Sequence, residues 1–329
     1  MHCTTSNRSL FQLGAAVAFA ACTLVAAKAA SNPVITTIPV GTFAGGIVAA
    51  SKSHLVYVAQ PNEDQIGVIN AKTNELSSAI IVAAGEPIGL AISPDGTNLY
   101  ATIQTAGLHG LLEEISAKTG EVLLSLPTGS TPQLPAVSPD ESVICVPNLG
   151  DGTVSVFSPD FEGPVTVNGD PVQAVFLSDS LVVVTNETTI INEIDTSSGT
   201  VPKTFNVATP VFGEVLTKNR KTLYAAGQNA VYAVDLATGT PTTIPVSAPA
   251  NATLGVPTLS ANGEFLYVPV LESNMTVGLS VVIVIDTKTN ATVGSPIPVG
   301  EAPIQIALVG LVGYVSNEIS GTVTVIRTK

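Results

Sequence analysis

Residues 265–300, FLYVPVLESNMTVGLSVVIVIDTKTNATVGSPIPVG, contain the pattern that decides the fold. A short apolar strand around Tyr267 is followed by a second strand, 282–286, and by the polar turn 287–290. Asn tolerates a positive φ, so this turn favours a tight hairpin. Residues 296–300 then add an outer strand. Such a small sheet cannot bury both of its faces alone, which predicts that the unit is repeated.

Strands with a Tyr-like anchor recur along the chain at intervals of 39 to 47 residues. The anchors are Tyr57, Tyr100, Ile144, Val183, Tyr224, Tyr267 and Tyr314. A second strand such as Val154-Ser155-Val156 follows each anchor, and its alternation indicates one buried face. Two further strands and turns such as Ser93-Pro94-Asp95-Gly96 complete each unit. The period predicts an all-β fold, a seven-bladed β-propeller with four-stranded antiparallel blades.

The two ends of the chain complement each other. Residues 34–41 are similar to the outer strand 296–300, whereas the C-terminus stops after the strand 322–326, before any outer strand of its own. We therefore expect the N-terminal strand to join the last blade and close the ring. Closure leaves no long unpaired edge, which is how propellers avoid edge-to-edge aggregation.

Several units resemble the YVTN-type β-propeller repeat. The matching segments include Tyr314-Val315-Ser316-Asn317, Val183-Val184-Thr185-Asn186 and Val284-Ile285-Asp286-Thr287-Lys288-Thr289-Asn290. The resemblance covers about residues 34–329, with Ile144 and Val183 replacing Tyr and Ser158-Pro159-Asp160 replacing the expected turn. It implies the propeller fold. It leaves the function open, because similar repeats occur in surface-layer and adhesion-type proteins, in lactonase-like enzymes and in subunits resembling quinoprotein dehydrogenases.

The N-terminus has the features of a secretory signal. Arg8 precedes the apolar, Ala-rich stretch 10–27, and Ala27-Lys28-Ala29 suits signal peptidase. We expect a signal peptide at 1–29, a propeller at 30–329 and a secreted, extracellular protein. A membrane anchor and a lipoprotein signal ending at Cys22 are the alternatives.

Charge narrows the class of partner. The chain has 12 Lys and Arg against 25 Asp and Glu, and loss of Arg8 and Lys28 with the signal makes the balance more acidic. An acidic surface repels nucleic acid and anionic lipid headgroups. We therefore expect a protein, glycan or small-molecule ligand, with no nucleic acid and no membrane after signal cleavage.

Cysteine, tryptophan and histidine are scarce. Signal cleavage leaves Cys145 alone in an apolar strand, which predicts a small buried side chain and no disulfide. The chain has no Trp and no Cys-x-x-Cys-His, so a tryptophan-derived quinone and haem attachment to this chain are excluded. No cofactor is predicted from the motifs, and no metal site is assigned.

Propellers bind ligands in the loops at one mouth of the central channel, where we expect the chemistry of this protein. Glu86, Glu214 and Glu301 lie in loops that join an outer strand to the next inner strand, and Asp170 lies in another. His109 lies in a Gly-flanked loop of the second repeat. These side chains are catalytic candidates as acids or bases, and the carboxylates are candidate Ca²⁺ ligands. The alternative is that they are solvated turn residues.

Polar amides lie three or four residues after several anchors. Gln60, Asn148, Asn186 and Asn317 are candidate ligand-binding residues, and the alternative is that they bond the backbones of the blades. Asn-x-Thr sequons at Asn186, Asn251, Asn274 and Asn290 are candidate glycosylation sites in predicted loops.

Two functions follow from these features, and the sequence leaves open whether the protein is an enzyme. The first is a secreted, non-catalytic binding or interaction protein that uses loops at one mouth of the channel. The alternative is a lactonase- or cyclase-like enzyme that holds a small organic substrate at the same mouth, with His109 or a mouth carboxylate as acid or base.

Overall fold

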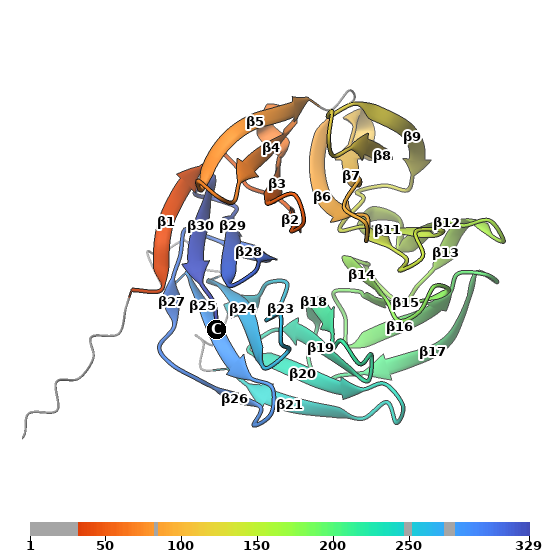
Figure 1. The fold of residues 1–329 in the computed structure, drawn as a ribbon. Coiled ribbons are helices and arrows are strands. Elements are labelled where there is room, and N and C mark those ends of the chain that lie inside the picture. Colours follow the sequence, from red (N-terminus) through yellow and green to blue (C-terminus); the bar gives the residue numbers. More distant parts are fainter. Residues whose placement is uncertain (1–31, 82–84, 247–251, 273–279) are drawn as a thin grey trace, which may run out of the picture. The chain divides into compact units, whose positions relative to one another are not determined.

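Seven antiparallel sheets follow one another around a ring (Figure 1). The computed structural model describes residues 32–81, 85–246, 252–272 and 280–329, and the ring belongs to the unit Pro33–Lys329. The expected signal at 1–29 lies outside the described residues. Among the described residues, no helix is long and apolar enough to span a membrane.

Blades 1 to 4 have regular strand order. Blade 1 comprises β2 (Ile47–Ala50), β3 (Leu55–Gln60), β4 (Gln65–Asn70) and β5 (Glu75–Ile81). Blade 2 comprises β6 (Glu86–Ile92), β7 (Asn98–Gln104), β8 (Gly110–Ser116) and β9 (Val122–Thr128). Blade 3 comprises β10 (Ala136–Val137), β11 (Ile144–Asn148), β12 (Thr153–Phe157) and β13 (Glu162–Thr166). Blade 4 comprises β14 (Gln173–Phe176), β15 (Leu181–Thr185), β16 (Ile190–Asp195) and β17 (Thr200–Asn206).

The remaining blades complete the ring. Blade 5 comprises β18 (Val211–Leu216), β19 (Thr222–Gly227), β20 (Ala230–Asp235) and β21 (Pro241–Pro245). Blade 6 comprises β22 (Ala252–Leu254), β23 (Thr258–Leu259), β24 (Phe265–Glu272), β25 (Val281–Asp286), β26 (Ala291–Thr292) and β27 (Ile297–Pro298). Blade 7 comprises β28 (Pro303–Val309), β29 (Val312–Asn317), β30 (Thr322–Arg327) and β1 (Val34–Pro39). Short 3₁₀ turns at η1 (Pro61–Glu63), η2 (Ala106–Leu108) and η3 (Leu149–Asp151) follow the second strand of blades 1 to 3.

Blade 6 has its inner and outer strands split in two. β22 and β23 both pair with β24, and they flank Pro257, which has no N–H to donate to a sheet. β26 and β27 both pair with β25, and Pro296 and Pro298 lie at the second of these strands. The outer strand predicted at 296–300 is therefore shorter than expected.

The ring is closed by the N-terminal strand, as the sequence predicted. β1 pairs antiparallel with β30, with Ile38 opposite Val323 and Thr37 opposite Thr324. Ile38 and Val40 are buried in the core between blades 7 and 1. The last blade thus takes its outer strand from the other end of the chain (Figure 1).

The core lies between the blades. Each pair of neighbouring blades shares one of the apolar clusters, and successive residues of a middle strand point to opposite neighbours. In β3, Val56 and Val58 pack toward blade 7, whereas Tyr57 and Ala59 pack toward blade 2. The prediction of one buried face per second strand was therefore wrong, because blades stack on both sides. Only outer strands such as β17 alternate between exposed and less exposed residues.

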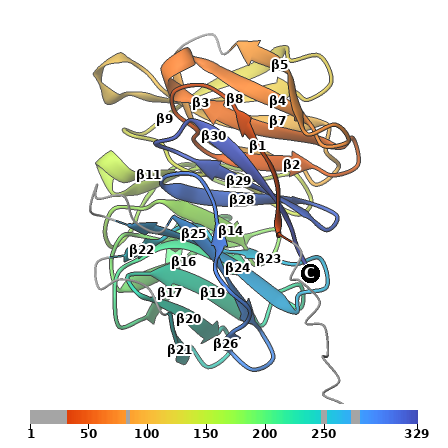
Figure 2. The same cartoon turned by 90° about the vertical axis from the view of Figure 1, so that its left-hand side faces the viewer.

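The strand order also sorts the loops onto two faces (Figure 2). Successive strands run antiparallel, so the connections from outer to next inner strand share one face with those from second to third strand. We call the described residues of this set the mouth loops; they are 40–46, 61–64, 85, 105–109, 129–135, 149–152, 167–172, 186–189, 207–210, 228–229, 246, 280, 299–302 and 318–321. The other connections form the opposite face.

Candidate functional site

A cavity of about 290 Å³ opens among the mouth loops at the centre of the ring. Every blade contributes to its lining, mainly through the first residues of its inner strand and the loop before it. The apolar side chains include Phe43, Ile88, Leu134, Phe212, Val256 and Ile304. The polar side chains include Gln133, Gln305 and the carboxylates Glu187 and Glu318. An apolar hollow with a few polar groups is typical of a small-ligand site.

The two carboxylates occupy equivalent places in different blades. Glu187 directly follows Asn186 after β15, and Glu318 directly follows Asn317 after β29. Blades 4 and 7 are three steps apart around the ring, so the two side chains approach the cavity from nearly opposite sides. Glu187 is exposed at the rim, whereas Glu318 is half-buried.

Their surroundings raise the pKa of both carboxyls. For Glu187 the larger cause is desolvation, and the negative charge of Asp170 adds to it. For Glu318 the cause of the raised pKa is desolvation. Desolvation disfavours the charged form of a carboxyl, so a cation near either group would be favoured. The sequence analysis did not single out these two residues.

The buried asparagine amides form hydrogen bonds between neighbouring strands of a blade. Asn148, Asn186 and Asn317 are fully buried, and each Nδ2 donates to a polar side chain of the next strand. The acceptors are Ser155, Asn192 and Thr324, at 2.7 to 2.9 Å. None of the three asparagines lines the cavity. These three bonds join neighbouring strands of the same blade, and the structure does not bring the three amides to the cavity.

Gln60 occupies the same place in blade 1 and is also buried. Gly67 stands where the other blades have the acceptor side chain, because it pairs with Val58 as Ser155 pairs with Val146. A Cβ at Gly67 would lie 3.1 Å from Gln60 Nε2, so the longer amide fills the space that the missing side chain leaves. Gln60 does not line the cavity either.

The predicted acid and base group is not assembled. Glu86, Glu301 and His109 are exposed, and none of them lines the cavity. The backbone N–H of Glu301 donates a hydrogen bond to Ser320 Oγ, and the carbonyl of His109 accepts a hydrogen bond from Thr105 Oγ1. Within the described residues, no group of three or more His, Cys, Asp and Glu side chains is placed to hold a metal ion.

Glu214 lies in the core instead of at the mouth. It is 1% exposed, and burial raises the pKa of its carboxyl well above the ordinary value. It pairs with Ala225 next to the anchor pair Val215–Tyr224, which places it between blades 4 and 5. Gln173 of blade 4 bonds both its backbone N–H and its carbonyl. Neither carboxyl oxygen has a hydrogen-bond partner in the described residues.

The remaining sequence candidates are placed as follows. Asn186 Nδ2, the atom that would carry a glycan, is buried and bonded inside the blade. Asn290 is half-buried in the turn after β25, and Asn251 and Asn274 lie outside the described residues. Cys145 is a free, fully buried thiol, as predicted, and desolvation raises its pKa.

Charge is distributed unequally between the two faces. The acidic residues of the mouth loops are Glu63, Asp64, Asp151, Asp170, Glu187, Glu301 and Glu318, and these loops contain no Lys or Arg. The loops of the opposite face contain Lys52, Lys72, Lys118, Lys218, Arg220, Lys221 and Lys288. The mouth is therefore an acidic surface around the cavity, whereas the opposite face is of mixed sign.

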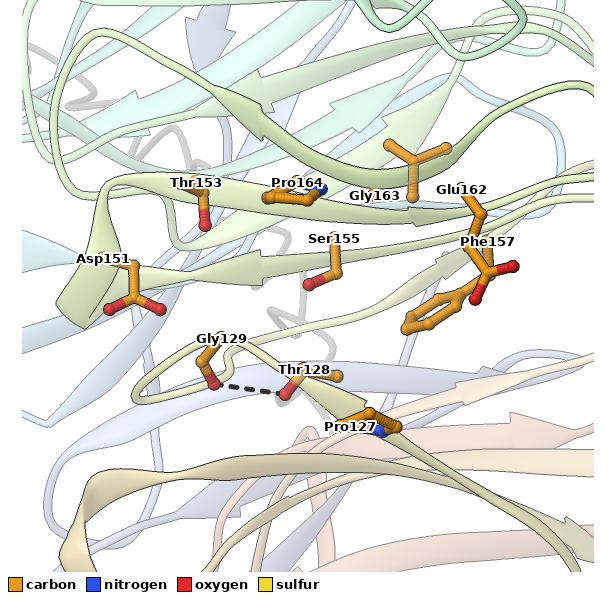
Figure 3. A pocket seen from close by; sticks show the side chains of 11 residues that line it. Pro127, Thr128, Gly129, Asp151, Thr153, Ser155, Phe157, Glu162, Gly163 and Pro164 are labelled. Atoms are coloured by element: carbon orange, nitrogen blue, oxygen red, sulfur yellow. Dashed lines mark hydrogen bonds between the residues drawn. The ribbon is translucent and has the colours of Figure 1, made fainter.

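A second hollow, of about 380 Å³, lies between blades 2 and 3 (Figure 3). Pro127, Phe157 and Pro164 form part of its wall, and Thr128 Oγ1 donates to the carbonyl of Gly129. The core between these blades has only Tyr100, Leu112 and Val146 as buried members, so the hollow coincides with the smallest inter-blade core. Only two blades line it, and we interpret it as a packing gap.

Comparison with known proteins supports the fold. The structure is similar to Kuenenia stuttgartiensis hydrazine synthase, with TM-score 0.71 and 17% identity over 91% of this chain and 97% of that chain. It is also similar to the β-propeller domain of Myceliophteria thermophila Cps50 (Swd1), with TM-score 0.72 and 11% identity over 90% of this chain and 99% of that chain. No protein-family model and no curated protein matches the chain. At these identities the likeness shows a seven-bladed β-propeller and no more.

Proposed function

We propose that this propeller is a binding protein that holds its ligand at the acidic mouth of the central channel. The observation that carries this proposal is the cavity of about 290 Å³, which all seven blades line. A rigid ring fixes the positions of loops that come from distant parts of the sequence. The lining combines a large apolar area with two opposed carboxylates, the composition of a site that orients a ligand.

The experiment compares ligand binding in two tryptophan variants. The Val256 side chain lines the cavity, so Val256→Trp should fill it, whereas Leu311→Trp adds the same side chain at an exposed position of the opposite face. A panel of amines, lactones, oligosaccharides, peptides and Ca²⁺ is screened by thermal shift, since a ligand of the native state raises its stability. A hit should be lost in Val256→Trp and kept in Leu311→Trp. A hit that survives Val256→Trp would place the site elsewhere.

An enzyme is the second candidate, on one observation. Glu187 and Glu318 have a raised pKa, and a carboxyl of raised pKa in an apolar cavity is suited to act as a general acid. This candidate is a lactonase-like hydrolase with these two groups replacing the acid and base that the sequence analysis selected. Turnover of a lactone that Glu187→Gln and Glu318→Gln both abolish would support it, and binding without turnover would exclude that substrate.

We further propose that the protein is an exported YVTN-type propeller. The signal pattern at 1–29 and the repeat pattern over 34–329 support this proposal. Mass spectrometry of the protein from the culture medium of its native host tests it. Cleavage near Ala29 is expected, and glycans are expected at Asn251, Asn274 and Asn290, with Asn186 unmodified because its Nδ2 is buried. An intact N-terminus would contradict the export proposal.

A further inference from the structure

We infer that the mouth cavity binds an organic ammonium ligand, whose charged nitrogen contacts Glu187 or Glu318. This inference rests on the proposed function and names the class of ligand. The chemistry is that of an alkylammonium ion, from either a free amine or a lysine side chain.

The two carboxylates of the cavity have no basic side chain near them in the mouth loops. Glu187 and Glu318 lie in mouth loops that contain no Lys or Arg, so no basic side chain of these loops neutralises them. Within the described residues, neither carboxylate accepts a hydrogen bond from the protein. A positively charged ligand would supply both the missing counter-charge and the missing donors, because an ammonium group carries three N–H donors.

Most of the other side chains of the cavity wall are aromatic or aliphatic. Phe43 and Phe212 contribute aromatic rings to the same cavity, and Ile88, Leu134 and Ile304 contribute aliphatic side chains. Aromatic faces attract alkylammonium ions through their quadrupole, and aliphatic walls accommodate the methylene chain. An anion would find two like charges here, and a neutral polyol would bury hydroxyls against apolar walls.

The charge difference between the two faces of the ring affects how a ligand approaches. All seven acidic residues of the mouth loops lie on the face that has the cavity, while seven Lys and Arg residues lie in loops of the opposite face. A cleft lined by one sign of charge concentrates ions of the other sign and orients them on approach. The polarity of the ring therefore directs a cation to the face that has the cavity.

The positions of the two carboxylates around the ring favour a ligand with two charged ends. Glu187 belongs to blade 4 and Glu318 to blade 7, nearly opposite each other around the ring. A diamine has two ammonium ends joined by an apolar chain, so it can satisfy both carboxylates while its methylenes contact the walls. Hexamethylenediamine is a suitable probe, and hexanediol and adipate are matched neutral and anionic probes.

The test is titration calorimetry of the three probes into the mature protein and its variants. We expect hexamethylenediamine to bind and hexanediol and adipate to bind at least tenfold more weakly. Glu187→Gln and Glu318→Gln should each weaken diamine binding about tenfold, equal to about 1.4 kcal/mol. Glu301→Gln removes the same charge from an exposed mouth loop outside the cavity, and it should change the affinity less than threefold.

The outcomes separate this inference from the proposed function. If hexanediol binds as well as the diamine, and Val256→Trp abolishes both, the cavity is a ligand site but the ammonium assignment is wrong. If none of the screened compounds binds in the cavity, both proposals fail. Equal weakening by Glu301→Gln and Glu187→Gln would show attraction to the whole face and would also overturn the assignment.

A peptide arm identifies the source of the ammonium group. A short blocked peptide with one lysine is compared with the same peptide bearing acetyl-lysine, which lacks the charge. Tighter binding of the lysine peptide than of the diamine would identify a protein partner, and the reverse order a free amine. Equal binding of the two peptides would overturn the inference for protein partners, because the charge would then contribute nothing.

Discussion

The hydroxyl of Tyr314, in blade 7, donates a hydrogen bond of 2.6 Å to Oδ1 of Asn74, in blade 1. Tyr57 makes the corresponding bond from blade 1 to the carbonyl of Ala117 in blade 2, at 2.9 Å. Tyr314 and Tyr57 thus bury their rings in one inter-blade core and bind the hairpin turn of the next blade with their hydroxyls. This double use gives a physical reason for tyrosine at these two anchors.

Removal of the Tyr314 hydroxyl should weaken the closure of the ring. Tyr314→Phe should lower the free energy of unfolding by about 0.5–1.5 kcal/mol, because Asn74 loses a buried donor. Tyr224→Phe is the matched control, since no hydroxyl bond is found for Tyr224 among the described residues, and it should be nearly neutral. Urea unfolding measures both. Equal destabilisation by the two substitutions would contradict the role of the hydroxyl bond.

Replacement of Glu214 by leucine should stabilise the protein. The corresponding core positions in blades 2 and 7 are Leu90 and Ile306, so the site accommodates an apolar side chain. Loss of a buried carboxyl without partners should raise the free energy of unfolding by about 1–3 kcal/mol. Glu75→Leu, on an exposed strand, should stay within about 0.5 kcal/mol of wild type. A destabilised Glu214→Leu variant would show that the carboxyl has a favourable partner.

The pH dependence of this effect has a defined sign. The pKa of the Glu214 carboxyl is raised in the folded state, so above the unfolded-state pKa the folded protein binds more protons than the unfolded chain. The Glu214 contribution to stability is therefore lost as pH rises from the unfolded pKa toward the folded one. The advantage of Glu214→Leu over wild type should grow with pH across this window. An advantage that shrinks with rising pH would contradict the assignment.

Closure by the N-terminal strand should be measurable at single residues. Ile38→Ala removes a side chain buried between blades 7 and 1 and should cost about 2–4 kcal/mol. Ile35→Ala, on the same strand but 37% exposed, should cost less than about 0.5 kcal/mol. Chemical unfolding of the two variants checks this prediction. Similar small costs would mean that β1 is not part of the cooperative core in solution.

Binding of an ammonium ligand should depend on pH through the mouth carboxylates. Because the pKa of both Glu187 and Glu318 is raised, their ionised forms should be lost at higher pH than for ordinary carboxyls. The affinity for hexamethylenediamine should therefore rise with pH from the ordinary glutamate range into the range above it, and calorimetry measures it. The Glu187→Gln, Glu318→Gln double variant should have lost this dependence. A constant wild-type affinity would contradict the role of the two groups.

The fold could be predicted from the sequence because its signals are local and repeated. Each anchor such as Tyr267 predicts one middle strand. The likeness of residues 34–41 to 296–300 predicts that the N-terminal strand is the outer strand of the last blade. Blade 6 departs from the prediction where strand pairing breaks near Pro257 and Pro296. Such interruptions depend on which N–H groups a neighbouring strand needs, and a repeat pattern does not carry that information.

The site was harder to predict, because it depends on side-chain direction. Asn186 and Glu187 are adjacent, yet the amide points into the blade and the carboxylate lines the cavity. The same holds for Asn317 and Glu318. The sequence did contain one signal for these site residues: a glutamate directly follows each of the two amides. Glu214 was misplaced because the sequence pattern assigned it to a loop, whereas it lies in β18 at the core position that Leu90 and Ile306 occupy in blades 2 and 7.

The ammonium site is tested most directly by a crystal structure of the mature protein grown with hexamethylenediamine. We expect the diamine in the central cavity, with an ammonium nitrogen within hydrogen-bond distance of Glu187 or Glu318 and its chain against the apolar lining. Diamine bound only outside the mouth, with the cavity holding water alone, would contradict it.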